Sequence, residues 1–480
     1  MVLYNPVMRN DTIAAIATPP GVGGIGVIRV SGPEAFTVVS SLVRRPGKPD
    51  ELPPVPPSHR LTYRLVIDPE TREVLDEVLV AFMRAPHTYT CEDVVEIQGH
   101  GGPLVLRRIL RAVLACGARM AEPGEFTMRA FLNGRLDLSQ AEAVMDLIDA
   151  QTEAGQRLAL QQLRGRLSDQ VQEIRHTILG VIAQIEASID FPEEDVPTPE
   201  AEELSPPIVT ALEQIQRLLA GAEQGKLFRQ GLRTAIIGRP NVGKSSLLNA
   251  LLRTERAIVT PIAGTTRDTV EEVANLRGIP LHLIDTAGIT PTDDPVEQIG
   301  VQRSRAAAES ADAVLLVFDG SEPLAEQDRR VSAELEMMGF GADEQTHKRP
   351  VVIVVNKADR DQRIELDELK QLWPLAPIVH TSTLNNEGLD ALEETLAELV
   401  LAGRAVNSDS VLVTNTRHQD ALRRANEHLQ ASKASLEQYL PLDFVSIDLR
   451  AAYEALGEIT GETASDDLLD RIFRDFCIGK

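Results

Sequence analysis

The segment Thr234–Ile237, followed by Gly238-Arg239-Pro240-Asn241-Val242-Gly243-Lys244-Ser245, decides the fold of the middle of the chain. It has the pattern G-x-x-x-x-G-K-S between an apolar strand and the helical start Ser246-Leu247-Leu248, which is the setting of a phosphate-binding loop. The glycines let backbone N–H groups turn toward phosphates, Lys244 reaches the β- and γ-phosphates, and Ser245 offers a hydroxyl to Mg²⁺. A chance Gly-rich turn would lack this strand and helix, so the segment predicts a nucleotide-binding domain.

Three later segments agree in order and context with a domain that binds GTP. Thr265-Thr266-Arg267-Asp268 provides a switch threonine for Mg²⁺, and Asp285-Thr286-Ala287-Gly288 follows the apolar strand Leu281–Ile284. Asn356-Lys357-Ala358-Asp359 follows the strand Val351–Val355. The Asp359 carboxylate can accept from N1–H and the 2-amino group of guanine. Adenine lacks both donors, and such a site rejects it by roughly 10⁴–10⁵, so we expect GTP as the ligand.

The residue after Asp285–Gly288 bears on catalysis. It is Ile289, where many GTPases carry a glutamine that positions the attacking water. An isoleucine cannot orient a nucleophile. Hydrolysis therefore needs another polar group or is slow.

Helical segments flank this alternating α/β segment on both sides. Before it, a long amphipathic stretch starts at a capping-box pattern, Ser139–Glu142, and reaches about Ile189, with Gly155 and Gly165 arguing against one unbroken helix. A further helix is expected over Glu200–Ala222. After it, helices are expected over Arg417–Leu440, Leu449–Leu456 and Asp466–Phe476. The economical arrangement is an α/β domain inserted into a helical domain.

Composition limits the protein class. The 480 residues suggest about three domains at roughly 100–200 residues each. There is no secretory signal, no apolar run of membrane-spanning length and no cysteine framework, so we expect a cytoplasmic protein. The net charge of −24 repels phosphate backbones on average, so an RNA contact needs a local basic patch. One candidate is Arg107–Arg135, with six arginines, and the alternative is an ordinary solvated helix face.

Over nearly its whole length the chain resembles the MnmE (TrmE) family of tRNA-modifying GTPases. The matching signatures are Thr18–Gly21 with Gly23-Gly24, Gln98–Gly102, Pro123–Phe126, Gly238–Ser245, Ile258–Asp268, Asp285–Gly288, Val296–Gly300 and Cys477-Ile478-Gly479-Lys480. The resemblance implies a multidomain α/β plus all-α protein. Its expected parts are an N-terminal α/β tetrahydrofolate-binding-like domain (1–133), a helical domain in two parts (134–229 and 403–480, the latter with the C-terminal tail) and an inserted Ras-like P-loop G domain (230–402).

The resemblance also implies a K⁺ ion that stabilises the transition state, G domains that dimerise across it, and a homodimer. The ligands of the K⁺ ion would be Asn241, Thr260, Ile262 and Thr265. The ligands of Mg²⁺ would be Ser245 and Thr266. The implied catalytic residues are Lys244, Thr266 and the water-orienting Glu297, which would fill the gap left by Ile289. The implied GTP-binding residues are Asn241, Val242, Gly243, Lys244, Ser245, Ser246, Thr260, Pro261, Ile262, Ala263, Gly264, Thr265, Thr266, Asp285, Thr286, Ala287, Gly288, Asn356, Lys357 and Asp359.

A second implied site lies in the N-terminal domain. The family binds a tetrahydrofolate derivative there (5-formyl or 5,10-methylene form) as a one-carbon donor, and the matching positions are Arg29, Glu96, Arg135 and Lys480. A carboxylate suits the amino-pyrimidine edge of a pterin and arginines suit its anionic parts, although Arg29 could equally pair with an acid structurally. The resemblance implies that the C-terminal tail reaches this folate-binding site and that Cys477 is important for the modification.

Two departures from the family pattern concern the switch regions and the base loop. Thr290 stands where many members carry an arginine, and Thr381-Ser382-Thr383 stands where a Ser-Ala-type loop usually backs the base.

The function that the resemblance implies is that of a K⁺-dependent GTPase that works on tRNA with a flavin-dependent partner in a hetero-oligomer. Together they would add a carboxymethylaminomethyl (or aminomethyl) group to C5 of the wobble uridine. One alternative is a ribosome-assembly or other regulatory GTPase switch, which a basic RNA-binding module would favour. Another is a dimerising scaffold, which intact GTPase activity without folate binding would favour.

Overall fold

The structure is a computed structural model that describes residues 11–48, 50–190, 199–254, 272–285, 305–341, 349–401 and 412–480. In the described part of the N-terminal region, seven strands form one sheet in the order β3-β4-β5-β6-β2-β1-β7. The elements are β1 (Ile13–Ile16), β2 (Ile25–Ser31), α1 (Ala35–Leu42), β3 (Val43–Arg44), β4 (Arg60–Ile67), β5 (Val74–Met83), β6 (Val94–His100), α2 (Pro103–Ala115) and β7 (Arg119–Met120).

This sheet is covered on one face by two helices. Alternate residues of β2, such as Ile28 and Val30, pack with α1 and α2 into one buried cluster. Arg29 lies between them in sequence and therefore projects from the opposite face, where Phe126 and Ile13 form a smaller buried cluster. The sheet thus separates the helices from Arg29.

Helices distant in sequence form the middle of the molecule. They are α3 (Glu125–Leu132), α4 (Leu138–Asp149), α5 (Glu153–Leu163), α6 (Arg166–Asp190), α7 (Ala201–Ala220), α8 (Ala222–Gln230), α14 (Thr416–Glu437), α15 (Leu442–Thr460) and α16 (Asp466–Arg474). The long helices α6, α7, α14 and α15 share one apolar core, to which Ile185, Ile208, Leu429 and Leu449 contribute fully buried side chains. The helical part is therefore built from segments on both sides of an insertion.

The inserted part has a twisted sheet with buried faces. In its described residues the strand order is β13-β12-β11-β8-β10-β9, and all pairs are parallel except β9 with β10. Its elements are β8 (Leu232–Ile237), α9 (Lys244–Thr254), β9 (Glu272–Leu276), β10 (Ile279–Asp285), β11 (Ala313–Asp319), α11 (Glu326–Met337), β12 (Val351–Asn356), α12 (Leu366–Leu372), β13 (Ile378–His380) and α13 (Leu389–Leu401). Every residue of β11 and β12 is buried, as expected for central parallel strands.

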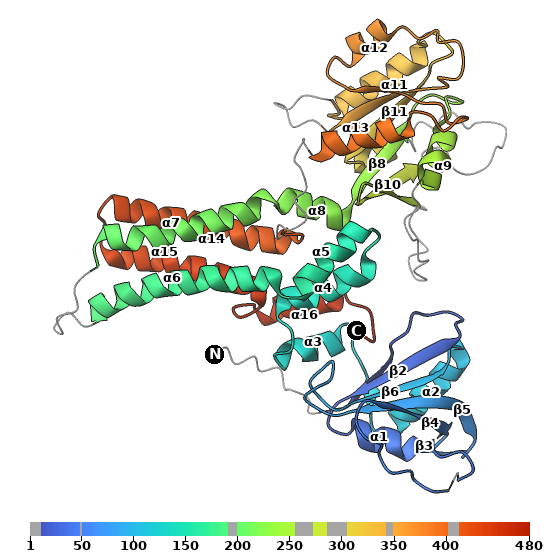
Figure 1. The fold of residues 1–480 in the computed structure, drawn as a ribbon, viewed down its shortest axis with the longest axis vertical. Helices are drawn as coiled ribbons and strands as arrows, with labels where there is room; N and C mark the ends of the chain where they lie inside the picture. Colours follow the sequence, from blue (N-terminus) through green and yellow to red (C-terminus); the bar gives the residue numbers. More distant parts are fainter. Residues whose placement is uncertain are drawn as a thin grey trace.

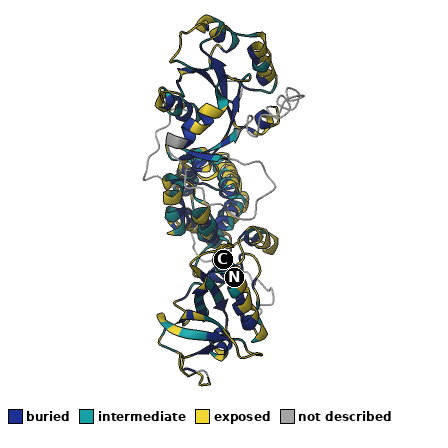
Figure 2. Ribbon diagram, turned by 90° about the vertical axis from the view of Figure 1, so that its right-hand side faces the viewer, coloured by how far each residue is buried: buried dark blue, intermediate teal, exposed yellow. Residues whose placement is uncertain are grey.

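The three parts are arranged along one long axis, with the N-terminal sheet and the inserted sheet at opposite ends and the helices between them (Figure 1). Buried residues gather inside each part separately (Figure 2). Within the residues described, no helix combines the length and the apolar character needed to cross a membrane.

The chain leaves and re-enters the helical part at one place. Gly225 of α8 lies so close to the carbonyl of Val413 that a Cβ atom would find no room, so α8 and the segment before α14 run side by side. Thr152, the N-cap of α5, also donates a hydrogen bond to the carbonyl of Gly278 at the β9–β10 turn (2.7 Å). Both links support the expected insertion of an α/β segment into a helical domain.

Some local expectations were wrong. The capping box belongs to Asp137 and Gln140, while Ser139 is buried and shares a hydrogen bond with Ser168 (2.9 Å). The long amphipathic stretch is three helices, as the two glycines indicated: Gly165, with a φ of 84°, lies at the break after Leu163, but the first break follows Asp149 and Gly155 lies inside α5.

Candidate functional site

The phosphate-binding loop joins the buried strand β8 to α9. Asn241 and Gly243 both have positive φ angles, 64° and 103°. The side-chain amide of Asn356 fills the space where a Cβ of residue 243 would stand, so a glycine is required there. The loop therefore wraps closely before the N-terminus of α9, a place where backbone N–H groups favour an anion.

The lysine of this loop is held by its own backbone. Lys244 Nζ donates to the carbonyls of Gly238 and Arg239, both at 2.8 Å. Ser245 and Ser246 follow in the first turn of α9 and are exposed. This places an ammonium group and two hydroxyls at one helix end, as phosphate and Mg²⁺ binding require.

Asn356 and Lys357, at the end of β12, bind the phosphate-binding loop through hydrogen bonds. Asn356 Nδ2 donates to the carbonyl of Val242 (2.9 Å), and Lys357 Nζ donates to the carbonyl of Asn241 (3.0 Å). The Asn356 Oδ1 atom in turn accepts from the backbone N–H of Thr383 (3.4 Å). Two segments more than a hundred residues apart are thus held in one arrangement.

Asp359 is oriented by Ser382. The Ser382 hydroxyl donates to Asp359 Oδ1 at 2.6 Å, and this hydrogen bond lowers the pKa of Asp359 below its ordinary value. The carboxylate is exposed and ionised, which suits it to accept from a base edge. The Thr381–Thr383 loop, despite its departure from the usual pattern, supplies the hydroxyl that fixes this acid.

Sequence reasoning missed Asp319, which belongs to the same cluster. It ends β11, is 5% exposed and forms an ion pair with Lys357 Nζ at 2.5 Å. Burial alone would raise the pKa of Asp319, but hydrogen bonds from Lys357 and Ser321 lower it below its ordinary value. A carboxylate at the end of a buried parallel strand beside the loop strand was the available signal.

The structure does not describe several predicted site residues. Those outside the described residues are Thr260, Pro261, Ile262, Ala263, Gly264, Thr265, Thr266, Thr286, Ala287, Gly288 and Glu297. The backbone of Asp285 is described, and it pairs with Ile236 of β8, next to the phosphate-binding loop.

A second cluster lies on the open face of the N-terminal sheet. Arg29 of β2 and Glu96 of β6 face each other in register, and their side chains form an ion pair with Nη2–Oε1 at 2.9 Å. The Arg29 guanidinium lies over the ring of Tyr89, 5.4 Å from its centroid. Arg135 lies over the same ring (4.9 Å) and donates to the Tyr89 carbonyl (2.8 Å). Tyr89, which sequence reasoning missed, therefore links the two arginines.

The C-terminal segment Cys477–Lys480 lies against this cluster. The backbone N–H of Phe126 donates to the Lys480 carbonyl (3.2 Å), and Ile478 forms a β-bridge with Pro123. Burial, and then the charge of Arg29, lower the pKa of Lys480, while Glu96 opposes them. Arg29, Glu96 and Lys480 are thus brought together from distant parts of the sequence, with Arg135 attached through Tyr89.

The thiol of Cys477 is exposed beside this cluster. Its backbone carbonyl accepts from Gly124 N–H (3.4 Å), which fixes the segment where it meets the N-terminal domain. An open cavity of about 520 Å³, lined in part by His59, shares Tyr89 and Arg135 with the cluster around Arg29. The size suits a small organic ligand.

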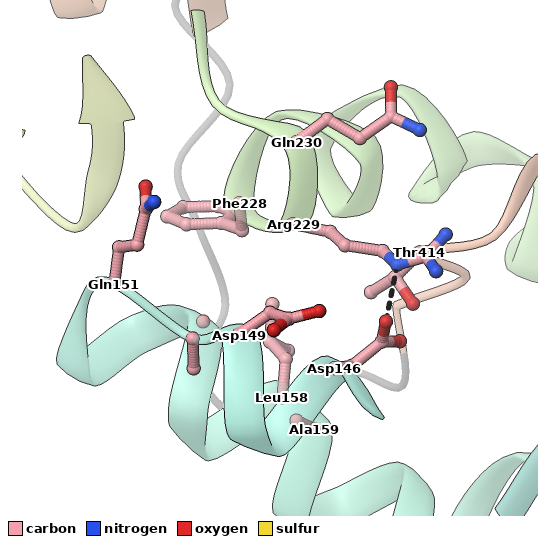
Figure 3. A pocket seen from close by; sticks show the side chains of 11 residues that line it. Asp146, Asp149, Gln151, Leu158, Ala159, Phe228, Arg229, Gln230 and Thr414 are labelled. Atoms are coloured by element: carbon pink, nitrogen blue, oxygen red, sulfur yellow. Dashed lines mark hydrogen bonds and ion pairs between the residues drawn. The ribbon is translucent and has the colours of Figure 1, made fainter. Parts of the chain in front are cut away.

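A further cavity, of about 260 Å³, lies where α8 meets α4 and α5 (Figure 3). Arg229 crosses it and pairs with Asp146 at 2.7 Å, as the dashed line in Figure 3 marks. Burial raises the pKa of Asp146 and of Asp149, although Arg229 opposes the shift for both. This cavity belongs to neither predicted site. It lies beside α8, the helix that leads into the inserted part.

Two family profiles match the sequence. One, described as the GTP-binding protein TrmE N-terminus, matches residues 12–135, and the other, described as the MnmE helical domain, matches residues 138–477. The tRNA modification GTPase MnmE of Desulforamulus reducens is 47% identical over 474 residues, which cover 98% of this chain and 100% of that protein.

The chain belongs to the MnmE family of tRNA modification GTPases.

Another MnmE relative, from Geobacillus thermodenitrificans, is 49% identical over 476 residues and covers 98% of this chain and 99% of its own length. Among solved structures, the G domain of the T. maritima FeoB iron transporter is 28% identical and covers 35% of this chain and 98% of its own, with a TM-score of 0.26. Membership in the MnmE family rests on the sequence relatives and the profiles, which together span nearly the whole chain.

Proposed function

We propose that this protein is a K⁺-dependent GTPase that, with a flavin-dependent partner, installs the carboxymethylaminomethyl (or aminomethyl) group at C5 of the tRNA wobble uridine. Membership in the MnmE family supplies the reaction class. The observation that carries the proposal to this chain is the meeting of Arg29, Glu96 and Lys480 on one sheet face. The cluster lies at the end of the molecule remote from the nucleotide loop (Figure 1), which supports a second binding site besides the one for GTP.

In the proposed GTP site, different residues of the chain bind the phosphates and the guanine base. Lys244 would exchange its carbonyl partners for the β- and γ-phosphates, and the first turn of α9 would supply N–H donors. Asp359, ionised and fixed by Ser382, would accept from N1–H and the 2-amino group of guanine. Asn356 and Lys357 would hold the base segment and the phosphate segment at a constant separation.

The oxygen groups of the described residues fit the two cations. Ser245 offers a hydroxyl to Mg²⁺, which is usually bound by one or two protein oxygens together with substrate phosphates. Asn241 offers an amide oxygen to K⁺, at a position where its carbonyl is already anchored by Lys357. When bound, the cations would neutralise the charge that develops at the β–γ bridge. Thr266, Thr260, Ile262 and Thr265 complete the proposed ligand sets.

The K⁺ dependence has its own test. We expect GTP hydrolysis to be stimulated by K⁺ and not by Na⁺ at equal ionic strength, because the smaller ion fits the same oxygen ligands less well. The initial rate of phosphate release in matched chloride salts measures this. Equal rates would remove Asn241 from its proposed role.

The N-terminal cluster fits a reduced folate. Glu96 would accept from the amino-pyrimidine edge, and Arg29, Arg135 and Lys480 would hold its polar and anionic parts. When bound, the folate would supply the one-carbon unit. The exposed Cys477 lies in the same terminal segment as Lys480, and we propose that Cys477 is required for modification.

The proposed domains follow this division of labour. Residues 1–133 would bind the folate, 134–229 with 403–480 would form the helical domain, and 230–402 would form the G domain. A homodimer would join two G domains across their K⁺ ions, and the flavin-dependent partner would complete a hetero-oligomer in the cytoplasm, where tRNA is modified.

The deciding experiment is mass spectrometry of nucleosides from bulk tRNA of a strain that lacks this gene. We expect the 5-substituted wobble uridines to disappear, and to return with the wild-type protein but not with a variant that lacks Lys480. An unchanged nucleoside profile would contradict the proposal and leave ribosome assembly as the leading alternative.

A further inference from the structure

The helix α2 has an unusual outward face. Its buried face is formed by Leu106, Ile109, Leu110 and Val113, which pack on the N-terminal sheet. Its outward stripe has the spacing i, i+3, i+4, i+7 and consists of Leu104, Arg107, Arg108 and Arg111, all exposed. The thirteen residues of α2 include no acid. A solvated helix face normally carries both signs of charge, and this one carries only cations.

The structure separates the six arginines between residues 107 and 135 into two groups. Arg119 and Arg129 are bound inside the protein by Glu125 and Asp11, and Arg135 is bound to Tyr89. These three serve the fold or the folate cluster. Arg135 is exposed as well but is bound to Tyr89, so the three exposed arginines of α2 are the ones outside both of these groups.

Two of these three arginines have no acidic partner. Among the described residues, no ion pair involves Arg107 or Arg111, and the only side-chain hydrogen bond that either donates runs from Arg107 Nε to the carbonyl of Pro103 in its own helix (3.1 Å). Arg108 pairs with Glu73 at 3.0 Å, and both side chains are about half exposed. Such surface pairs contribute about 0–1 kcal/mol, so Glu73 holds Arg108 weakly.

We propose that the outward face of α2 binds the phosphate backbone of the tRNA substrate, through Arg107, Arg108 and Arg111. The proposal rests on the proposed function, because it names the surface that the tRNA of that reaction contacts. In a chain of net charge −24, an acid-free helix presents the charge complement that a polyanion requires. Arg107 and Arg111 are one helical turn apart and can follow successive phosphates.

This surface anchors the tRNA rather than reading it. The sheet lies between α2 and the Arg29–Glu96 cluster, so the arginines contact a part of the tRNA other than the base that is modified. Phosphate contacts carry no sequence information. Their loss should therefore weaken binding of all tRNAs alike.

The test is the affinity of the full-length protein for bulk deacylated tRNA, measured by filter binding between 50 and 200 mM KCl (about the range over which phosphate contacts weaken most visibly). We expect Arg107→Ala/Arg111→Ala to weaken binding at least about tenfold and to reduce the log–log salt slope by roughly 1–2. Glu73→Gln should act in the opposite direction and strengthen binding up to about threefold, because it releases Arg108. A loss of fold could not produce both results.

The matched control is Arg329→Ala/Arg330→Ala on α11, which removes two exposed arginines from another helix. We expect it to leave tRNA affinity within about twofold. Equal loss in the control and in the α2 variant would mean that only overall charge matters and would overturn the proposal.

Unchanged tRNA binding by Arg107→Ala/Arg111→Ala would also overturn the proposal that α2 binds tRNA. This holds even if the variant no longer bound an acidic protein, because the face would then serve a protein partner. Failure of the wild-type protein to bind any tRNA would also overturn this proposal, whereas an unchanged nucleoside profile in the strain lacking the gene would overturn the proposed function. The two failures are therefore distinguishable.

Discussion

Asp359 depends on one neighbouring hydroxyl for its orientation, so the pair offers a graded test at the scale of single residues. Asp359→Ala removes both acceptors for the guanine edge and should weaken GTP binding by about 100-fold or more. Ser382→Ala removes only the hydrogen bond that orients the acid and should cost a factor of about ten or less. Titration with a fluorescent guanine nucleotide measures both. GTP affinity within twofold of wild type for Asp359→Ala would contradict the assignment.

Glu297 is the residue on which the proposed hydrolysis depends. Glu297→Ala should abolish GTP hydrolysis and leave GTP affinity within a few-fold, because the proposed role of this residue is to orient water and not to hold the nucleotide. Single-turnover hydrolysis and equilibrium binding of the same preparation measure the two effects. A large loss of binding would show that its role lies elsewhere.

Single residues also mark the limit of what the sequence could predict. The motif residues Lys244, Asn356 and Asp359 were predictable because fixed chemistry demands them at fixed spacings. Asp319 and Tyr89 were not predicted, since their roles arise only when strands and loops distant in sequence come together. Ser139 was mistaken for a cap because the true cap, Asp137, lies two residues earlier and satisfies the same pattern with Gln140.

At the scale of elements, a buried charge cluster joins α4 to α14. Glu142, 7% exposed, accepts hydrogen bonds from Arg417 and from the fully buried His418. Burial alone would raise the pKa of Glu142, but His418 and Arg417 lower it to about 2. Burial lowers the pKa of His418, so this ring favours the neutral form.

This cluster makes the helical domain sensitive to acid. The folded-state pKa of both groups is below the unfolded value, so their stabilisation is present at neutral pH and is lost as the pH falls. The loss of stability starts below about pH 6.5, where His418 takes up a proton more readily in the unfolded chain than in its buried site. It continues between about pH 4.5 and pH 2, where the same holds for Glu142. The urea concentration at the midpoint of unfolding, followed by far-UV circular dichroism between pH 7 and 4, measures this loss of stability.

A substitution isolates the contribution of this cluster. Glu142→Gln should lower the free energy of unfolding by about 3 kcal/mol at pH 7, because Arg417 loses its buried partner, and should flatten the acid dependence. Glu394→Gln, which removes an exposed partner of Arg277, should change it by less than about 0.5 kcal/mol. Equal effects of the two substitutions would contradict the assignment.

Elements differ in how far the sequence predicts them. The buried strands β8, β11 and β12 were predictable from continuous apolar runs bounded by turn residues. The edge strand β9 and the strand β4 were not, because each mixes polar and apolar residues and is defined by its hairpin partner. The break of the amphipathic stretch after Asp149 was also missed: α5 starts anew at its N-cap Thr152, whose hydroxyl accepts from Gly155 N–H and donates to the carbonyl of Gly278.

At the scale of the whole molecule, the close approach of Gly225 and Val413 predicts that the inserted part can be removed. Replacing residues 231–411 with a Gly/Ser linker of about six residues, which can span about 20 Å, should leave the helical core intact. We expect cooperative urea unfolding and retention of the described N-terminal cluster, with complete loss of GTP binding. A molten or insoluble product would show that the helices need the insertion for stability.

The insertion also sets an order of events during synthesis. The apolar faces of α6 and α7 are covered by α14 and α15, and about 185 residues separate the end of α8 at Gln230 from the start of α14 at Thr416. At about 5–20 residues per second, the ribosome needs roughly 10–40 s to reach the first of the covering helices. For that interval half of a bundle is exposed while the G domain folds beside it. We therefore expect the apolar faces of those two helices to be open to molecular chaperones, or to aggregation, until α14 and α15 have been made.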